Sequence, residues 1–154
     1  MARTYLEVRE QLNAINNARK KLAELKVLRS EKAFLSDLAE WLVENIYDGK
    51  RESSTYEKGW DLTINTKKVQ VKGHGTATIN STRRTKIYHE TNRKFDELII
   101  MVFSRDYLVK EFYQIPHDVV YERVAGYKLY WDSCTDYKIE LSSLPKQELI
   151  SLFV

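Results

Sequence analysis

Hydrophobic positions near the start of the chain recur at helical spacing. Between about Thr4 and Arg29, apolar side chains follow steps of three and four residues, and neither Gly nor Pro interrupts them. This spacing predicts one long amphipathic helix. Its apolar positions are Tyr5, Val8, Leu12, Ile15, Leu22, Leu25 and Leu28. Because such a stripe has to be buried against the rest of the chain or against a second copy, we expect residues 1–29 to form a dimerisation element and the protein to be a homodimer.

A second helix is predicted directly after the first. Ser30 is the expected N-cap, and the apolar positions from Phe34 to Ile46 keep helical spacing. The helix should end near Tyr47, with Gly49 as its stop signal.

The pattern then changes to alternation with a period of two. Residues 60–65 and 68–72 read as the strands of an antiparallel hairpin with Thr66 and Lys67 as its turn. In that register Asp61 faces Lys72, and a longer turn of the same parity sorts the side chains in the same way. One face of the hairpin is apolar and carries Trp60, Leu62, Ile64, Val69 and Val71. The other face is polar and carries Asp61, Thr63, Gln70 and Lys72.

The rest of the chain supplies more strands. Glu97–Phe103 is a continuous apolar run typical of a buried strand, and 109–115 is its expected hairpin partner, ended by Pro116. We expect a strand at 127–131, a terminal helix at 145–152, and a loop with a short helix at 76–94. The order of helices and strands predicts an α/β or α+β fold around a mixed sheet, with residues 30–154 as one domain.

Composition narrows the class of protein. The chain has 154 residues, 43% of them hydrophobic, which suits a single globular core. No apolar run approaches the roughly 18 residues of a membrane helix, and the N-terminus lacks the apolar stretch of a secretory signal. Cys134 is the only cysteine, so an intramolecular disulfide and a Cys-rich zinc site are excluded. We expect a cytoplasmic protein without a membrane partner.

Charge is concentrated in one segment. The net charge is +3, but residues 67–94 contain eight basic residues and one acid, a distribution that favours a polyanion-binding surface. The alternative is a solvated loop with excess lysine. The expected DNA contacts are Lys67, Lys68, His74, Arg83, Arg84, Lys86, Arg93 and Lys94. His74 lies between two glycines, so a contact with phosphate competes with a role as an exposed turn residue.

The polar face of the hairpin is suited to phosphodiester hydrolysis. Mg²⁺ prefers oxygen ligands, which Asp61 and the amide oxygen of Gln70 can supply. The metal polarises the phosphate and lowers the pKa of a bound water. Lys72 can orient or deprotonate that water and offset charge at phosphorus. The competing interpretation is a solvated Asp61–Lys72 ion pair worth about 0.2–1 kcal/mol.

Asp61 followed by Gln70-Val71-Lys72 on a strand resembles the PD-(D/E)xK nuclease superfamily, whose members often carry a Glu on the preceding helix. Glu40 occupies that position here, and Glu57 is a fallback. Gln70 replaces the commoner Glu, and Trp60 replaces the Pro before the Asp. The resemblance implies a restriction-endonuclease-like fold, with catalysis by Asp61, Gln70, Lys72 and Glu40. It also implies Mg²⁺, for which Mn²⁺ can substitute, held by Asp61, Gln70 and Glu40.

The expected function is therefore a Mg²⁺-dependent DNA endonuclease of the restriction type. A Holliday-junction resolvase or repair nuclease is the alternative within the enzymes. A second class is a non-catalytic DNA-binding module with a degenerate nuclease fold, which Gln70 motivates. A third is a helical oligomerisation protein with no role on nucleic acid.

Overall fold

The computed structural model describes residues 2–30, 33–53, 59–75, 82–87 and 95–154. Their centre is a mixed sheet of five strands in the order β1-β2-β3-β5-β6. These strands are β1 (Lys50–Arg51), β2 (Leu62–Ile64), β3 (Lys67–Gly75), β5 (Glu97–Phe103) and β6 (Val109–Pro116). Strands β3 and β5 run parallel, whereas the other neighbouring strands are antiparallel. The predicted mixed α+β fold is thereby confirmed.

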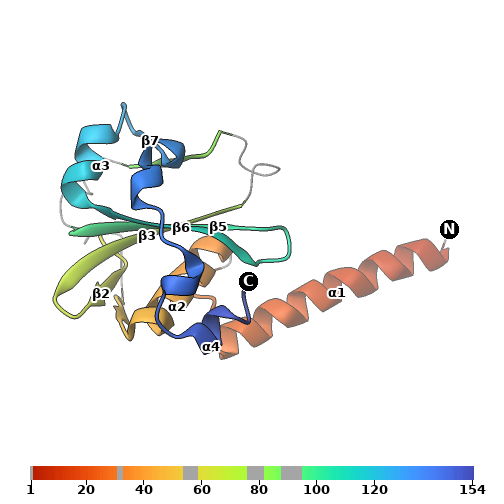
Figure 1. Ribbon diagram of the computed structural model, residues 1–154. Coiled ribbons are helices and arrows are strands. Elements are labelled where there is room, and N and C mark those ends of the chain that lie inside the picture. The colour runs from red at the N-terminus through yellow and green to blue at the C-terminus, as the bar shows by residue number, and fades with distance from the viewer. Residues whose placement is uncertain (1, 31–32, 54–58, 76–81, 88–94) are drawn as a thin grey trace.

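Helices and a small second sheet cover the two faces of this sheet. Helix α2 (Phe34–Tyr47) and the short C-terminal α4 (Gln147–Ile150) lie on one face, as Figure 1 shows. The other face carries α3 (His117–Arg123) and a two-stranded sheet of β4 (Arg84–Lys86) and β7 (Lys128–Tyr130). The short 3₁₀ helices η2 (Trp131–Tyr137) and η3 (Leu141–Ser143) connect β7 to α4.

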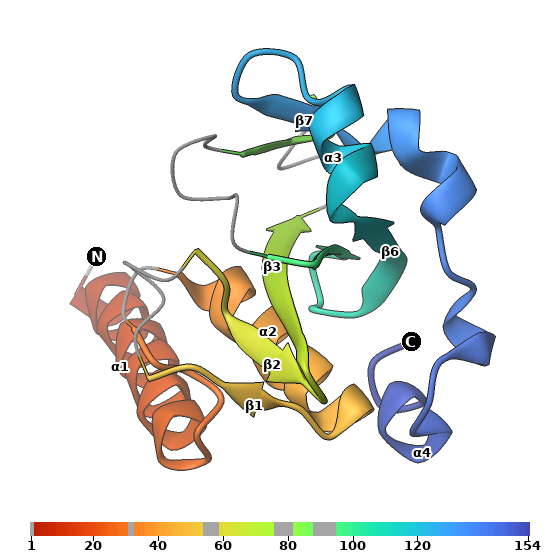
Figure 2. The same cartoon turned by 90° about the vertical axis from the view of Figure 1, so that its left-hand side faces the viewer.

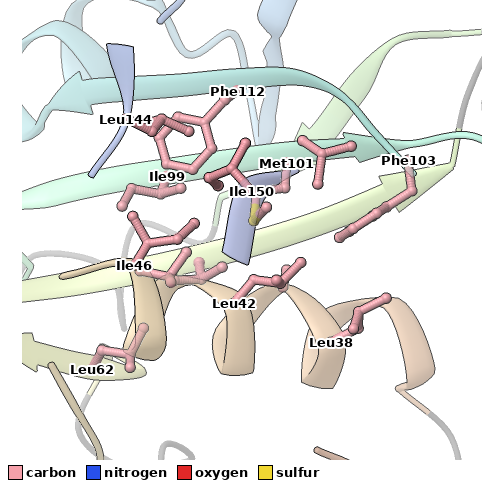
Figure 3. Packing of buried hydrophobic residues seen from close by; sticks show 14 of the residues in the cluster. Leu38, Leu42, Ile46, Leu62, Ile99, Met101, Phe103, Phe112, Leu144 and Ile150 are labelled. Carbon is pink, nitrogen blue, oxygen red and sulfur yellow. The ribbon is translucent and has the colours of Figure 1, made fainter. Parts of the chain in front are cut away.

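The protein has two hydrophobic cores, one on each face of the five-stranded sheet, because successive side chains of β5 point to opposite faces. Ile99, Met101 and Phe103 point toward α2, where they meet Leu38, Leu42 and Ile46 (Figure 3). The intervening residues point to the opposite face and pack with Ile87, Leu129 and Trp131. That second set from β5 consists of Leu98, Ile100 and Val102. Burial on both sides accounts for the unbroken apolar run of this strand.

Helix α1 (Ala2–Glu24) extends away from the rest of the molecule (Figure 1). It ends earlier than predicted because Lys26 adopts a left-handed backbone with φ of 65°. The N–H of Val27 donates to the carbonyl of Leu22, a hydrogen-bond pattern that closes helix ends. The resulting turn directs Val27 and Leu28 into the core, so only the C-terminal end of α1 is anchored there.

Helix α2 begins and ends close to the predicted positions, but with different caps. The helix starts at Phe34, and Ser30 does not cap it. Instead the buried carboxylate of Asp37 accepts hydrogen bonds from the N–H groups of Arg29 and Ser30 and from the Ser30 hydroxyl. At the other end, Asp48 adopts the left-handed conformation that ends the helix, one residue before the predicted stop signal Gly49.

The hairpin of β2 and β3 is shifted from the predicted register by two residues. Leu62 pairs with Val69 and Ile64 with Lys67, so Asn65 and Thr66 form the turn. Asn65 supplies the positive φ of 55° that a tight hairpin needs. The predicted pairing of Asp61 with Lys72 is therefore wrong, but an even shift leaves each side chain on its predicted face. Leu62, Val69 and Val71 are buried against α2 accordingly.

Several other predictions from the sequence need correction. Trp60 precedes β2 and packs with the second core instead of sharing a face with Leu62. β4 lies inside the segment predicted as a loop, and the C-terminal helix is limited to 147–150. Neither β1 nor α3 was predicted. None of the helices in the described parts of the chain combines the length and apolar character needed to cross a membrane.

Candidate active site

Asp61 lies directly before β2, at the fork where β2 and β3 separate. Its N–H donates to the carbonyl of Val69 at 2.9 Å, and its Oδ2 accepts the N–H of Val71 at 2.8 Å. The carboxylate thus takes the place of the strand carbonyl that would otherwise satisfy Val71. Asp61 is only 5% exposed. The backbone contact therefore holds a buried acidic group at the fork.

Gly73 allows α2 to approach β3 closely enough to bring Glu40 to this fork. A Cβ at Gly73 would clash with the carbonyl oxygen of Leu35 and would lie 3.0 Å from the Cβ of Ala39. No other residue type fits this contact without moving the helix. Glu40 directly follows Ala39 in α2, which packs against β3 (Figure 2).

The two carboxyl groups interact directly. The pKa of Glu40 is raised from 4.5 to about 8. Burial is the main cause, and the negative charges of Asp61 and Asp37 contribute to the same shift. Burial also raises the pKa of Asp61, against the lowering effects of the Val71 N–H, Lys72, Arg29 and a hydrogen bond with Glu40. With its pKa raised to about 8, Glu40 keeps its proton at neutral pH and can donate it in the hydrogen bond that links it to Asp61.

Lys72 completes this cluster. Burial lowers the pKa of its ammonium group, while the nearby carboxyl groups of Asp61 and Glu40 act in the opposite direction. The structure thus brings together Glu40, Asp61 and Lys72, three of the four predicted catalytic residues. Gln70 is two positions earlier on the same strand and half-buried. By strand alternation its side chain leaves β3 on the same face as Lys72.

His74 is not an exposed turn residue. It is part of β3, and its ring lies 5.1 Å from that of Trp131 in the second core. Burial, followed by the charge of Lys72, lowers its pKa to about 4. Its imidazole is therefore neutral at physiological pH and offers no positive charge to a phosphate, which removes the electrostatic reason for the predicted contact.

Those of the remaining predicted DNA contacts that the structure describes lie on different elements, and several have partners within the protein. Lys67 pairs with Glu97 at 2.9 Å, and the ammonium of Lys68 lies 4.6 Å from the ring centre of Trp60. Arg83 pairs with Glu111 and Asp132 at 2.7 and 2.9 Å, so its positive charge is balanced by acids of the same chain. Arg84 and Lys86 belong to the separate β4–β7 sheet. Arg93, Lys94 and the fallback ligand Glu57 lie outside the described residues.

The cluster has the donor types that Mg²⁺ uses. Burial raises the pKa of both carboxyl groups, of Glu40 and Asp61, so a positive charge added beside them would be favourable. Gln70 can add an amide oxygen, and Mg²⁺ commonly combines few carboxylates with several waters. Within the described ranges, no group of three or more His, Cys, Asp or Glu side chains could hold a metal. A site here would therefore depend on the amide and on water.

The sequence did not single out the residues that shape this cluster. Gly73 was considered only as the end of a strand, although its lack of a side chain positions α2. Arg29 and Asp37 were not predicted to act here, and no local pattern marks them. No protein-family model matches the chain, and no curated protein matches it in sequence. A functional assignment therefore rests on the geometry of the cluster and on its spacing along the chain.

Proposed function

We propose that this protein is a Mg²⁺-dependent DNA endonuclease, of the restriction type. The observation that carries the proposal is the meeting of a helix glutamate, a fork aspartate and a strand lysine in one buried cluster. These side chains come from separate segments of the chain, and a solvated surface ion pair would not bury both acids. The cluster also agrees with the resemblance of Asp61 and Gln70-Val71-Lys72 to PD-(D/E)xK nucleases.

Each side chain has a distinct task in this proposal. Asp61, anchored by the Val71 N–H, and Glu40 would hold the metal together with Gln70. When bound, Mg²⁺ polarises the phosphodiester and makes a water more acidic. Lys72, whose pKa is lowered by burial, exchanges a proton with the attacking water more readily than an exposed lysine. In its charged form it stabilises the negative charge that develops on the phosphate oxygens.

The test is incubation of the protein with supercoiled plasmid and with branched DNA, with Mg²⁺, with Mn²⁺ and with a chelator. We expect metal-dependent cleavage that Asp61→Asn abolishes and that Asp106→Asn, at an exposed turn, leaves intact. Preference for branched DNA would make the enzyme a junction resolvase or repair nuclease. DNA binding without cleavage under every metal condition would refute the catalytic proposal and favour a non-catalytic module.

A dimer through α1 follows from the same proposal. Tyr5, Val8, Leu12 and Ile15 are each about half exposed or more, and they repeat at the alternating steps of three and four that form a coiled-coil seam. A second copy is the partner best matched to this seam, because a symmetric dimer presents two active sites to the two strands of a duplex. Sedimentation should show a dimer for the wild type and a monomer for Leu12→Glu. A wild-type monomer at high concentration would contradict this arrangement.

A further inference from the structure

A groove lies between the last turns of α1 and the segment that leads to α2. Its volume is about 590 Å³. The polar residues that line it are Asn16, Arg19, Lys20, Arg29 and Ser30. No acidic residue is among its described lining residues, so it combines three cations with hydrogen-bonding groups. This composition suits the phosphates of a nucleic acid.

The two arginines of the groove are held in place by contacts within the fold. The Arg19 guanidinium lies 5.2 Å from the ring centre of Phe34, at the start of α2. Arg29 donates to the carbonyl of Glu52 at 2.7 Å and to that of Ser53 at 3.2 Å. Since Arg29 already has these protein partners, Arg19 and Lys20 are the cations best placed to contact a ligand.

The groove is physically connected to the candidate active site. Its wall at Arg29 and Ser30 is fixed by Asp37, which accepts their backbone N–H groups at 2.9 and 2.8 Å. Asp37 precedes Glu40 by three residues in α2, so the two lie on neighbouring turns of one helix face. The charge of Arg29 also acts on both Glu40 and Asp61.

A neighbouring hollow of about 450 Å³ shares Leu28 and Arg29 with the groove but is a weaker candidate. Its Arg51 is committed to the carbonyl oxygens of Lys26 and Val27 and to Glu44. Two acids, Glu44 and Glu52, also line it. These acids offset part of its positive charge, which makes it less attractive to a polyanion than the groove.

We propose that the groove between α1 and the Leu28–Ser30 segment binds the phosphodiester backbone of duplex DNA beside the cleavage site, through Arg19 and Lys20. This inference rests on the proposed function and gives α1 a second role besides dimerisation. The main DNA contact then lies on α1, not on residues 67–94 as the charge distribution alone suggested.

The test is the salt dependence of binding to a fluorescein-labelled DNA duplex, measured by anisotropy in a chelator so that nothing is cleaved. Arg19→Gln combined with Lys20→Gln should weaken binding and reduce the slope of log Kd against log salt by about 1.8, because each phosphate contact contributes about 0.9. Arg9→Gln with Lys21→Gln removes the same charge from α1 outside the groove and should leave the slope unchanged. Circular dichroism checks that both variants remain helical.

The outcomes separate this inference from the proposed activity. An unchanged slope in the groove variant, or an equal loss in the control, overturns the groove while cleavage by the wild type still stands. A reduced slope in the groove variant alone supports the groove even if no metal produces cleavage, in which case the nuclease proposal fails by itself. If the wild type does not bind the duplex at low salt, both are overturned.

Discussion

Replacing Glu40 by Gln removes a buried group whose ionisation opposes folding. In the folded protein, burial and the charges of Asp61 and Asp37 raise the pKa of Glu40 from 4.5 to about 8. In the unfolded chain the same carboxyl ionises near 4.5. Because the folded state holds the proton more tightly, the stability associated with Glu40 is fully present below pH 4.5 and declines as the pH rises to about 8.

The size of this effect follows from the pKa difference. Each pKa unit corresponds to about 1.4 kcal/mol, so the rise from 4.5 to about 8 costs at most about 5 kcal/mol above pH 8. At pH 7 the corresponding cost is about 3 kcal/mol. A Gln at this position keeps a hydrogen-bond donor for Asp61 but cannot ionise. Glu40→Gln should therefore be more stable than the wild type at pH 8, by an amount that shrinks toward pH 5.

Urea unfolding at a series of pH values, with a chelator present, measures this difference directly. Glu10→Gln, an exposed position on α1, serves as the control and should follow the wild type at every pH. The reasoning is refuted if the difference in unfolding free energy between Glu40→Gln and the wild type is the same at pH 5 and pH 8. A destabilised Glu40→Gln at pH 8 would contradict it as well.

Two further predictions concern the metal and the contact between α2 and β3. Mg²⁺ should raise the thermal midpoint of the wild type, more at pH 8 than at pH 6 because Glu40 must lose its proton, and calorimetry should show no such rise for Asp61→Asn. Gly73→Ala should destabilise the protein by about 1–3 kcal/mol, because the new methyl group meets the Leu35 carbonyl. Ser142→Ala, at an exposed position of η3, is its control, and equal urea midpoints for the two variants would disprove the close contact.

The fold was predictable where the hydrophobic pattern has one structural interpretation. The apolar run of Glu97–Phe103 and the helical spacing from Phe34 to Ile46 both led to the observed elements. Short elements were missed because they owe their structure to partners distant in sequence. β4, for example, is defined by its pairing with β7, in which Arg84 opposes Tyr130, and no local pattern in Arg84–Lys86 shows this.

The candidate site was predictable in its residues but not in its geometry. The alternation around Asp61 and Lys72 placed both side chains on one face, and this survived an error in register because the error was even. What brings Glu40 to them is the contact of Gly73 with α2, which only the folded structure shows. For the basic segment, a count of charges does not reveal which side chains have partners within the fold. Arg83, for instance, is bound by Glu111 and Asp132.

The central claim is that Lys72 acts with Asp61 and Glu40 on a phosphodiester bond. The most direct measurement is single-turnover cleavage of plasmid DNA in Mg²⁺ by the wild type, by Lys72→Ala and by Lys110→Ala, which removes an exposed lysine from β6. We predict that the wild type and Lys110→Ala cleave at equal rates, and that Lys72→Ala binds the plasmid equally well but cleaves it at least about a hundredfold more slowly. Undiminished cleavage by Lys72→Ala would contradict the account.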